Sequence, residues 1–306
     1  MYDTLHMWLE WSKVEQLDLT QTINILSNTK EYRSKDNNSL IGKLNNFRVT
    51  INETGISLKG SLAKYYYGNN FETLTRDDTK KAIEKLSADL YLPMQLSKIT
   101  RLDFGANLIL NYPVSSYISF LGDKRYFKRV QATKTSLYYN TIKKRINIYD
   151  KIKEAKSKKS YIPDYFKRKN VLRYELRFEK RVSEQFNRPE LIASTLYDED
   201  FFKSLINILK QEYDSIQKIN KLDVKNVKEI KTPNDGINAL CGALLNKAGL
   251  DTITNFITDI KAKNVYKYPK YYSIVNSKLK DLANNTQISM QNEFISELDI
   301  KIKNLL

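Results

Sequence analysis

Two stretches decide the fold of this chain: RINIYDKIKE at residues 145–154 and VLRYELRFEK at residues 171–180. Both contain runs that alternate apolar and polar residues, which is typical of β-strands, because successive side chains on a strand point to opposite faces. An earlier stretch, KITRLDFGANLIL at residues 98–110, alternates in the same way. The polar positions of the three runs are Arg101, Asp103, Gly105 and Asn107, then Arg145, Asn147 and Tyr149, then Arg173, Glu175, Arg177 and Glu179. If the runs lie in one sheet, its open face gathers a tyrosine, two acids and several cations.

The rest of the chain predicts an α+β protein of two domains. At 306 residues the chain exceeds the usual size of a single domain. Strand patterns dominate up to about residue 185, and the pattern after 186 is helical. We therefore predict an antiparallel-sheet domain with flanking helices at 1–185 and a helical C-terminal domain at 186–306. Because every candidate site residue precedes 180, the chemistry is expected in the first domain.

The pattern also places individual elements of the first domain. Residues 31–39, EYRSKDNNS, read as a charged loop, and the tyrosines at 65–67 read as a strand end whose rings, beside Lys59 and Lys64, either stack unpaired bases or pack a rim. The other expected elements are a strand at 2–11, a helix at 17–28, two strands within 44–66, a helix at 76–90 and a hairpin turned near 140–144.

Composition excludes several classes of protein. The chain has no apolar stretch of the ~18–20 residues that a membrane span needs and no signal-peptide pattern, so we expect a soluble cytoplasmic protein. Its one cysteine, Cys241, excludes a disulfide framework within the chain. Its one histidine, His6, excludes a paired-histidine metal site and is read as structural.

The charge of the chain is concentrated around the polar strands. The net charge is +16, and residues 121–180 hold 19 Lys and Arg against 6 Asp and Glu, which places +13 of it in that segment. A strong basic excess predicts a polyanionic partner, most simply nucleic acid. A lysine-rich composition of the source proteome would raise the total charge, but it would not cluster it.

The remaining motifs favour phosphoryl-transfer chemistry on the polar face. No GxxxxGK[ST] loop and no GxSxG elbow is present. Carboxylates without histidine suit Mg²⁺ or Mn²⁺, and a tyrosine beside such an ion is a candidate nucleophile. A phenol with a pKa near 10 is ionised to roughly one part in 10³ at pH 7, so a neighbouring charge must help, and Lys151 is the obvious candidate.

The segment SLYYNTIKKRINIYDKIKE followed by NVLRYELRFEKR resembles the core of rolling-circle replication initiators. It is similar to the Rep_trans-type plasmid initiators, and more closely to the phage and plasmid replication proteins of the filamentous-phage gene II/X kind. GSLAKYYYGNNFETL, RDDTKKAIEKLSADL and ITRLDFGANL match the order of the latter family, so the resemblance covers residues 1 to about 220.

The resemblance implies a role for each matching residue. Tyr149 would attack an origin phosphate, giving a 5′-phosphotyrosine and a free 3′-OH, with Lys151 as its charge partner. Asp103 and Glu175 would ligate the metal, with Glu154 as a weaker candidate. Relatives tend to carry a second acid where this chain has Asn107, whose carbonyl can still ligate. The predicted DNA-binding cations are Lys143, Lys144, Arg145, Arg173 and Arg177.

The resemblance also implies partners. These are origin DNA, single-stranded or in a cruciform at the nick site, and a host helicase and polymerase, without a membrane and with homodimer formation left open. The alternative function is a non-enzymatic, sequence-specific DNA- or RNA-binding regulator that uses the same basic cleft.

Alternatives stay open for individual residues as well. Glu175 could pair with Arg173 or Arg177, and Asp103 with Arg101. Tyr138 and Tyr139, on the preceding strand, compete with Tyr149 as the nucleophile.

Overall fold

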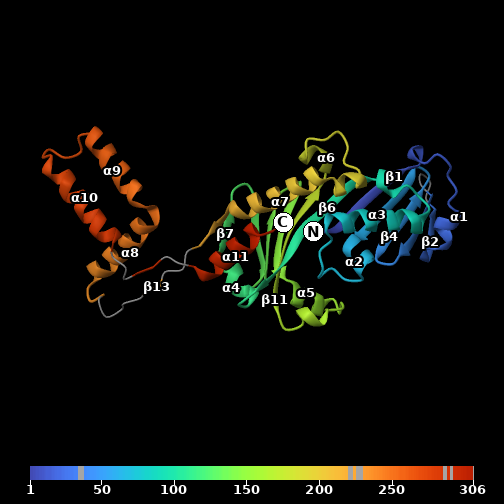
Figure 1. Cartoon of the computed structure of the whole chain (residues 1–306), viewed down its shortest axis with the longest axis horizontal. Helices are drawn as coiled ribbons and strands as arrows, with labels where there is room; N and C mark the ends of the chain where they lie inside the picture. The colour runs from blue at the N-terminus through green and yellow to red at the C-terminus, as the bar shows by residue number, and fades with distance from the viewer. Residues whose placement is uncertain (34–37, 220–222, 225–229, 285–287, 290–291, 306) are drawn as a thin grey trace. The chain divides into compact units, whose positions relative to one another are not determined.

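The computed structural model describes residues 1–33, 38–219, 223–224, 230–284, 288–289 and 292–305. The chain forms two compact units, Met1–Gln217 with Glu297–Leu306, and Lys218–Ser296. The first unit is built on a large antiparallel sheet flanked by helices, and helices make up most of the second (Figure 1). This confirms the predicted fold class.

The main sheet of the first unit has ten strands within the described residues. In sheet order they are β2 (Ser27–Arg33), β3 (Asn38–Leu44), β4 (Phe47–Asn52), β5 (Gly55–Ser61), β1 (Tyr2–Glu10), β6 (Lys98–Leu110), β11 (Asn170–Glu179), β10 (Lys144–Asp150), β9 (Ser136–Asn140) and β8 (Lys128–Thr133). The three predicted polar strands, β6, β11 and β10, are therefore neighbours. The hairpin predicted near 140–144 is confirmed, since β9 and β10 pair across it.

Helices and short strands flank this sheet in the first unit. They are η1 (Trp11–Lys13), α1 (Thr20–Asn24), α2 (Leu62–Tyr67), α3 (Arg76–Leu90), η2 (Met94–Leu96), α4 (Val114–Ile118), β7 (Leu121–Lys124), α5 (Lys151–Ser157), η3 (Asp164–Phe166), α6 (Val182–Gln185), η4 (Ala193–Tyr197), α7 (Glu199–Asp214) and β12 (Ile216–Lys218). The helix predicted at 76–90 is confirmed as α3, whose N-cap is Thr75 in a capping box with Asp78.

The second unit contains α8 (Pro233–Ala248), α9 (Leu250–Ala262) and α10 (Lys270–Ala283), with the strands β13 (Asp223–Val224) and β14 (Ile288–Ser289). Ile253, Ile257 and Ala283 form its small core. The last helix, α11 (Glu293–Lys303), begins in this unit and ends in the first. Across the described residues, none of the helices is both long and apolar enough to cross a membrane.

Helices α7 and α11 pack on the apolar face of the sheet, where Figure 1 shows them running side by side. The Tyr174 hydroxyl of β11 donates to the Leu209 carbonyl at 2.8 Å, and the Tyr213 hydroxyl donates to Asp299 Oδ1 at 2.7 Å. Residues 186–217 thus belong to the sheet unit. The compact units divide after Gln217 instead of at 185/186, because α7 covers apolar strand residues that would otherwise face water.

Two predicted elements near the N-terminus differ in the structure. The helix expected at 17–28 is only α1, because Ser27–Arg33 pairs with β3 as an edge strand. Part of the loop expected at 31–39 is therefore strand, and residues 34–37 lie outside the described residues. The tyrosines 65–67 lie in the helix α2, where the Ser61 hydroxyl caps the N-terminus.

The polar face of the sheet is partly covered near β10 and β11, contrary to the open face that the sequence predicted. Helix α5 begins directly after β10, because the Asp150 carboxylate accepts from the Lys153 backbone N–H at 2.9 Å and caps it. Ile152 and Ala155 of α5 then pack with Phe71 and Val171. This small apolar cluster closes one side of the polar face.

Candidate functional site

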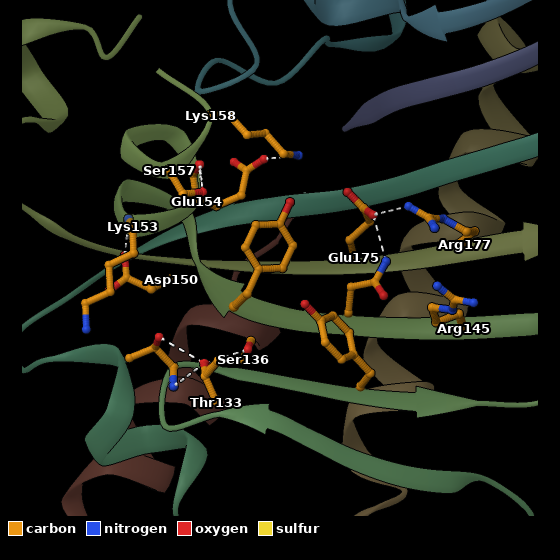
Figure 2. Close-up of a pocket in the computed structure, with 14 residues that line it drawn as sticks. Thr133, Ser136, Arg145, Asp150, Lys153, Glu154, Ser157, Lys158, Glu175 and Arg177 are labelled. Carbon is orange, nitrogen blue, oxygen red and sulfur yellow. Dashed lines mark hydrogen bonds and ion pairs between the residues drawn. The ribbon is translucent and has the colours of Figure 1, made fainter. Parts of the chain in front are cut away.

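A cavity of about 490 Å³ opens on the polar face between β9, β10, β11 and α5. Figure 2 shows Glu154 and Lys158 on the α5 side, Arg145 and Arg177 on the opposite side, and Glu175 between them. The cavity is lined by Thr133, Thr135, Ser136, Tyr138, Arg145, Asn147, Tyr149, Asp150, Lys153, Glu154, Ser157, Lys158, Glu175 and Arg177. Most predicted site residues of β10 and α5 therefore meet in one place.

Tyr149 lies at the end of β10, in register with Ser136 on one neighbouring strand and Arg173 on the other. Its side chain is half-buried and lines the cavity. Burial raises the pKa of the Tyr149 phenol well above its ordinary value, the charge of Glu175 raises it further, and the Arg173 guanidinium opposes this. The phenol is therefore neutral at pH 7 and must lose its proton to a neighbouring group if it is to attack.

The two competing tyrosines differ in access to this cavity. Tyr139 is fully buried, and its hydroxyl donates to the Gly122 carbonyl at 2.7 Å. Tyr138 pairs with Asn147 across the strands and lines the cavity. Tyr138 thus remains the competitor of Tyr149, and Tyr139 serves the core.

A buried charge network lies beneath the cavity and is centred on Arg173, which is 1% exposed. Its guanidinium donates to Asp3 Oδ2 at 3.1 Å and to Glu175 Oε2 at 3.3 Å. Glu175 Oε1 also accepts from the Asn147 amide at 3.0 Å. Asp3 in turn accepts from the Ser61 hydroxyl and, at 3.0 Å, from the Asn70 amide. Such burial is tolerable only because each charge has a partner.

The two acids of this network differ in their pKa shifts. Burial by itself raises the pKa of Asp3, but Arg173 and the Ser61 hydrogen bond overcome it, so the pKa lies below its ordinary value. Burial raises the pKa of Glu175, and the charges of Asp103 and Asp3 add to it against the opposing effect of Arg173. Of the two, Glu175 is the one that lines the cavity and the one disposed to accept a proton.

Asp103 forms a second cluster beside the first. Arg101 donates to both its carboxylate oxygens at 2.9 and 2.6 Å, and Arg177 reaches the same carboxylate at 3.0 to 3.2 Å. Arg177 also lies 3.7 Å from Glu175 Oε1, as the dashed line in Figure 2 marks. Asp103 thus links Arg101 to Arg177, and it does not line the cavity.

Helix α5 carries the remaining predicted residues. The Lys151 ammonium, which is buried, lies 2.8 Å from Glu154 Oε2, and the Lys158 ammonium lies 2.6 Å from Glu154 Oε1. Burial lowers the pKa of Lys151, although Glu154 opposes this. The Arg173 charge lowers the pKa of the Tyr149 phenol, opposing the effect of burial, and the Lys151 ammonium donates to Glu154.

The predicted DNA-binding cations separate into four groups. Arg145 and Arg177 line the cavity, and Arg173 is buried below it. Lys143 is exposed at the strand edge, 3.6 Å from Glu184. Lys144 points to the opposite face, where its ammonium lies 2.6 Å from Glu212 Oε1 of α7. That partition follows from the alternation of the strand, which puts Lys144 with Ile146 and Ile148.

The predicted metal ligands are only partly brought together. Glu154 and Glu175 line the cavity; Asp103 does not, and the Asn107 amide donates to the Asn70 and Phe71 carbonyls at 3.2 and 2.7 Å. Among the described residues, no group of three or more His, Cys, Asp or Glu side chains could hold a metal. Mg²⁺ is commonly held by one or two carboxylates together with substrate phosphates. The Glu154 oxygens pair with Lys151 and Lys158, and the Glu175 oxygens accept from Asn147 and Arg173, so either acid must exchange a partner to hold an ion. The metal stays a proposal.

Asp3 is the functional candidate that sequence reasoning missed. Its signal is an acid at the start of the apolar run YDTLHMWLE, where a charge requires a buried partner. The position of β1 between β5 and β6, which brings Asp3 to Arg173, is a long-range pairing that no local pattern contains.

Comparison with known proteins adds the family. No curated protein matches the chain. Residues 1–213 match the Phage_CRI family, which describes the N-terminal part of the gene II type of replication-associated protein, and this confirms the resemblance to the gene II/X kind of initiator. The matched segment covers the ten-stranded sheet, the cavity and nearly all of α7. The chain therefore belongs to the Phage_CRI family of replication-associated proteins.

Proposed function

We propose that this replication protein nicks and rejoins origin DNA through Tyr149. The observation that carries the proposal is the meeting of the Tyr149 side chain with Arg145, Arg177 and Glu175 in one cavity. Cations at the cavity wall suit a phosphodiester, and an adjacent carboxylate suits the proton of the attacking phenol.

The reaction balances with the residues that line the cavity. The Tyr149 oxygen forms a bond to phosphorus, the bond from phosphorus to the 3′ oxygen breaks, and the products are a 5′-phosphotyrosine and a free 3′-OH. The phenol proton passes to Glu175, whose raised pKa favours accepting it, and the departing 3′ oxygen takes a proton from solvent. Because the phosphotyrosine conserves the phosphodiester bond energy, the reverse step rejoins the strand without ATP.

The cations around the cavity stabilise the charge that develops on the phosphate. Arg145 and Arg177 are in register on adjacent strands, so two guanidinium groups face the cavity side by side. A divalent ion held by Glu154 and the substrate phosphate would supply further charge neutralisation when bound, while Glu175 stays available as the proton acceptor. Buried Arg173 positions Glu175 beneath Tyr149 and does not contact the substrate.

The experiment that tests the proposal is covalent capture. Tyr149→Phe removes one oxygen from a half-buried residue, so it should preserve folding and DNA binding while abolishing nicking, adduct formation and rejoining together. Tyr138→Phe is the matched control, because Tyr138 lines the same cavity and should leave all three activities in place. The substrate is a supercoiled plasmid that carries the DNA flanking the gene.

The outcomes separate the enzyme from its rival. An adduct whose labelled peptide contains Tyr138, or normal nicking by Tyr149→Phe, would remove Tyr149 as the nucleophile. Retarded DNA without any adduct on the wild-type protein, under all metal conditions, would support the non-enzymatic regulator instead.

A further inference from the structure

A row of basic residues crosses the sheet on the same face as the cavity. Lys43 of β3 is in register with Arg48 of β4, and Arg48 with Lys59 of β5. The row continues from Lys59 to His6 of β1 and from His6 to Arg101 of β6. Directly opposed residues of neighbouring strands share a face, so these side chains project together.

The row is not balanced by acids of its own. Lys43, Arg48 and Lys59 are exposed, and within the part of the chain that the structure describes none of them forms an ion pair. Like charges placed directly opposite one another destabilise a sheet. Three such neighbours therefore weaken the fold unless an anionic partner lies across them.

His6 lies between the cations of the row. Burial, with smaller contributions from the charges of Arg101 and Lys59, lowers the pKa of the His6 imidazole to about 4. Thus His6 is neutral at pH 7, and the cations on either side of it act on the same space.

The row leads into the catalytic cavity. Arg101 at its inner end holds the Asp103 carboxylate at 2.6 Å, and Asp103 is shared with Arg177, which lines the cavity. The polar face of β6 and β11 thus connects the exposed cations of β3–β5 to the site of attack without a change of face.

The shape of the surface selects among nucleic acids. Four strand spacings of about 4.8 Å separate β3 from β6, so the row is about 19 Å long on a sheet face. The major groove of B-DNA is about 12 Å wide and admits a helix or a two-stranded ribbon, not a face of five strands. A single strand can lie along such a face, with its phosphates on the cations.

We propose that Lys43, Arg48 and Lys59, the exposed cations of this row, bind the phosphates of single-stranded DNA that flanks the nick site, and that the strand then passes His6 and Arg101 to reach the cavity. This inference rests on the proposed function, because the nicking site in the cavity identifies the DNA strand that the row would bind. It assigns the β3–β5 region, which carries none of the predicted site residues, to substrate positioning.

The test is the salt dependence of binding to a 30-nucleotide single strand of thymidines. The variant Lys43→Gln/Arg48→Gln/Lys59→Gln removes three phosphate partners, so the slope of log K against log salt should become shallower by about 2, since each single-strand contact contributes about 0.7. If binding at 1 M salt is unchanged, that slope corresponds to an affinity about 100-fold lower at 0.1 M salt.

A second triple variant serves as the matched control. Lys80→Gln/Lys81→Gln/Lys203→Gln changes the net charge by the same amount, at exposed positions of α3 and α7 outside the sheet. It should change the slope by far less. Equal slopes for the two variants would reduce the effect to net charge and overturn the proposal. A loss confined to a 30-base-pair duplex would also overturn it and assign the row to double-stranded DNA.

The failure of this inference differs from the failure of the proposed function. If the row variant keeps wild-type binding and Tyr149 still forms its adduct, only the row is wrong. If no adduct forms on any residue while the row variant loses single-strand affinity, the row holds and the nicking chemistry is wrong. Urea unfolding of the row variant should show unchanged or higher stability, because opposed like charges have been removed.

Discussion

Replacing Arg173 with methionine tests whether the buried charge network holds the site together. The substitution keeps an unbranched, shorter apolar side chain and removes the charge that lies between Asp3 and Glu175. Both carboxylates are nearly inaccessible to water, with exposures of 4% each. Only neutral donors such as Ser61 and Asn147, together with more distant cations, would then offset the cost of burying these two charges.

The expected loss of stability is large. Removing one partner of a buried ion pair typically costs about 3–5 kcal/mol, because an uncompensated charge is left behind. A domain of this kind has a total stability of roughly 5–15 kcal/mol, so the variant is expected to fold but to unfold at much lower urea concentration. Arg177→Met is the matched control: Arg177 is about a fifth exposed, and Asp103 keeps Arg101 as a partner, so about 1 kcal/mol is expected.

The pH dependence makes the prediction specific. In the wild-type protein Arg173 holds the pKa of Asp3 below its ordinary value. This shift stabilises the fold at any pH above the ordinary pKa, and the stabilisation is lost as the pH falls through the folded-state pKa. Without Arg173, burial raises the pKa of Asp3 and raises that of Glu175 further. Each acid then favours its protonated form in the folded state, so the variant should lose stability as the pH rises from 4 to 7.

Urea unfolding followed by circular dichroism at pH 4, 5.5 and 7 measures this difference. The gap in unfolding free energy between wild type and Arg173→Met should be widest at pH 7 and should narrow toward pH 4. A gap below 1 kcal/mol at pH 7, or one that is independent of pH, would refute the reasoning that Arg173 compensates buried carboxylates. If the variant does not fold at pH 7, recovery of folded signal at pH 4 still checks the sign.

Two further predictions concern the metal and the domain boundary. Excess chelator should stop nicking while sparing most DNA binding, because the proposed ion is held only by Glu154 and the phosphate under attack. Robust nicking in excess chelator would remove the metal from the proposal and leave Glu154 paired with Lys151 and Lys158. A fragment that ends at residue 186 should aggregate, because it lacks α7, which covers Tyr174 through the Leu209 carbonyl. A variant in which a short linker replaces 218–296 should stay soluble and keep its cleavage activity. Soluble, active 1–186 protein would show that the sheet does not need α7.

Alternation in the sequence was sufficient to predict which side chains share a face. The runs around Asn107, Tyr149 and Glu175 lie on adjacent strands with their polar positions together, because the period of a strand is fixed by its backbone. The same rule assigns Lys144 to the opposite face, where it pairs with Glu212, although the charge of that segment alone suggested DNA binding. Periodicity was the stronger guide at that position.

The sequence did not predict how deeply individual side chains are buried or which residues pair across long distances in the chain. An arginine on a polar strand face reads as exposed, yet Arg173 is buried, because α5 and the segment around Phe71 cover that end of the face. Asp3 reaches Arg173 across 170 positions in the sequence, through a strand order that places β1 in the centre of the sheet. Neither fact has a local signature, and together they place Arg173 between two buried carboxylates instead of on an exposed face.

The surroundings of Tyr149 keep its phenol protonated while its side chain lines the cavity. A phenol in a carboxylate-lined cavity is a poor nucleophile at rest, since burial and Glu175 keep its proton in place. Under the proposed function, Arg145 and Arg177 neutralise a phosphate that is bound in the cavity, and Glu175, whose pKa is raised by burial, takes the phenol proton. On the same proposal, attack by Tyr149 is therefore expected only on a phosphate that lies against Arg145 and Arg177.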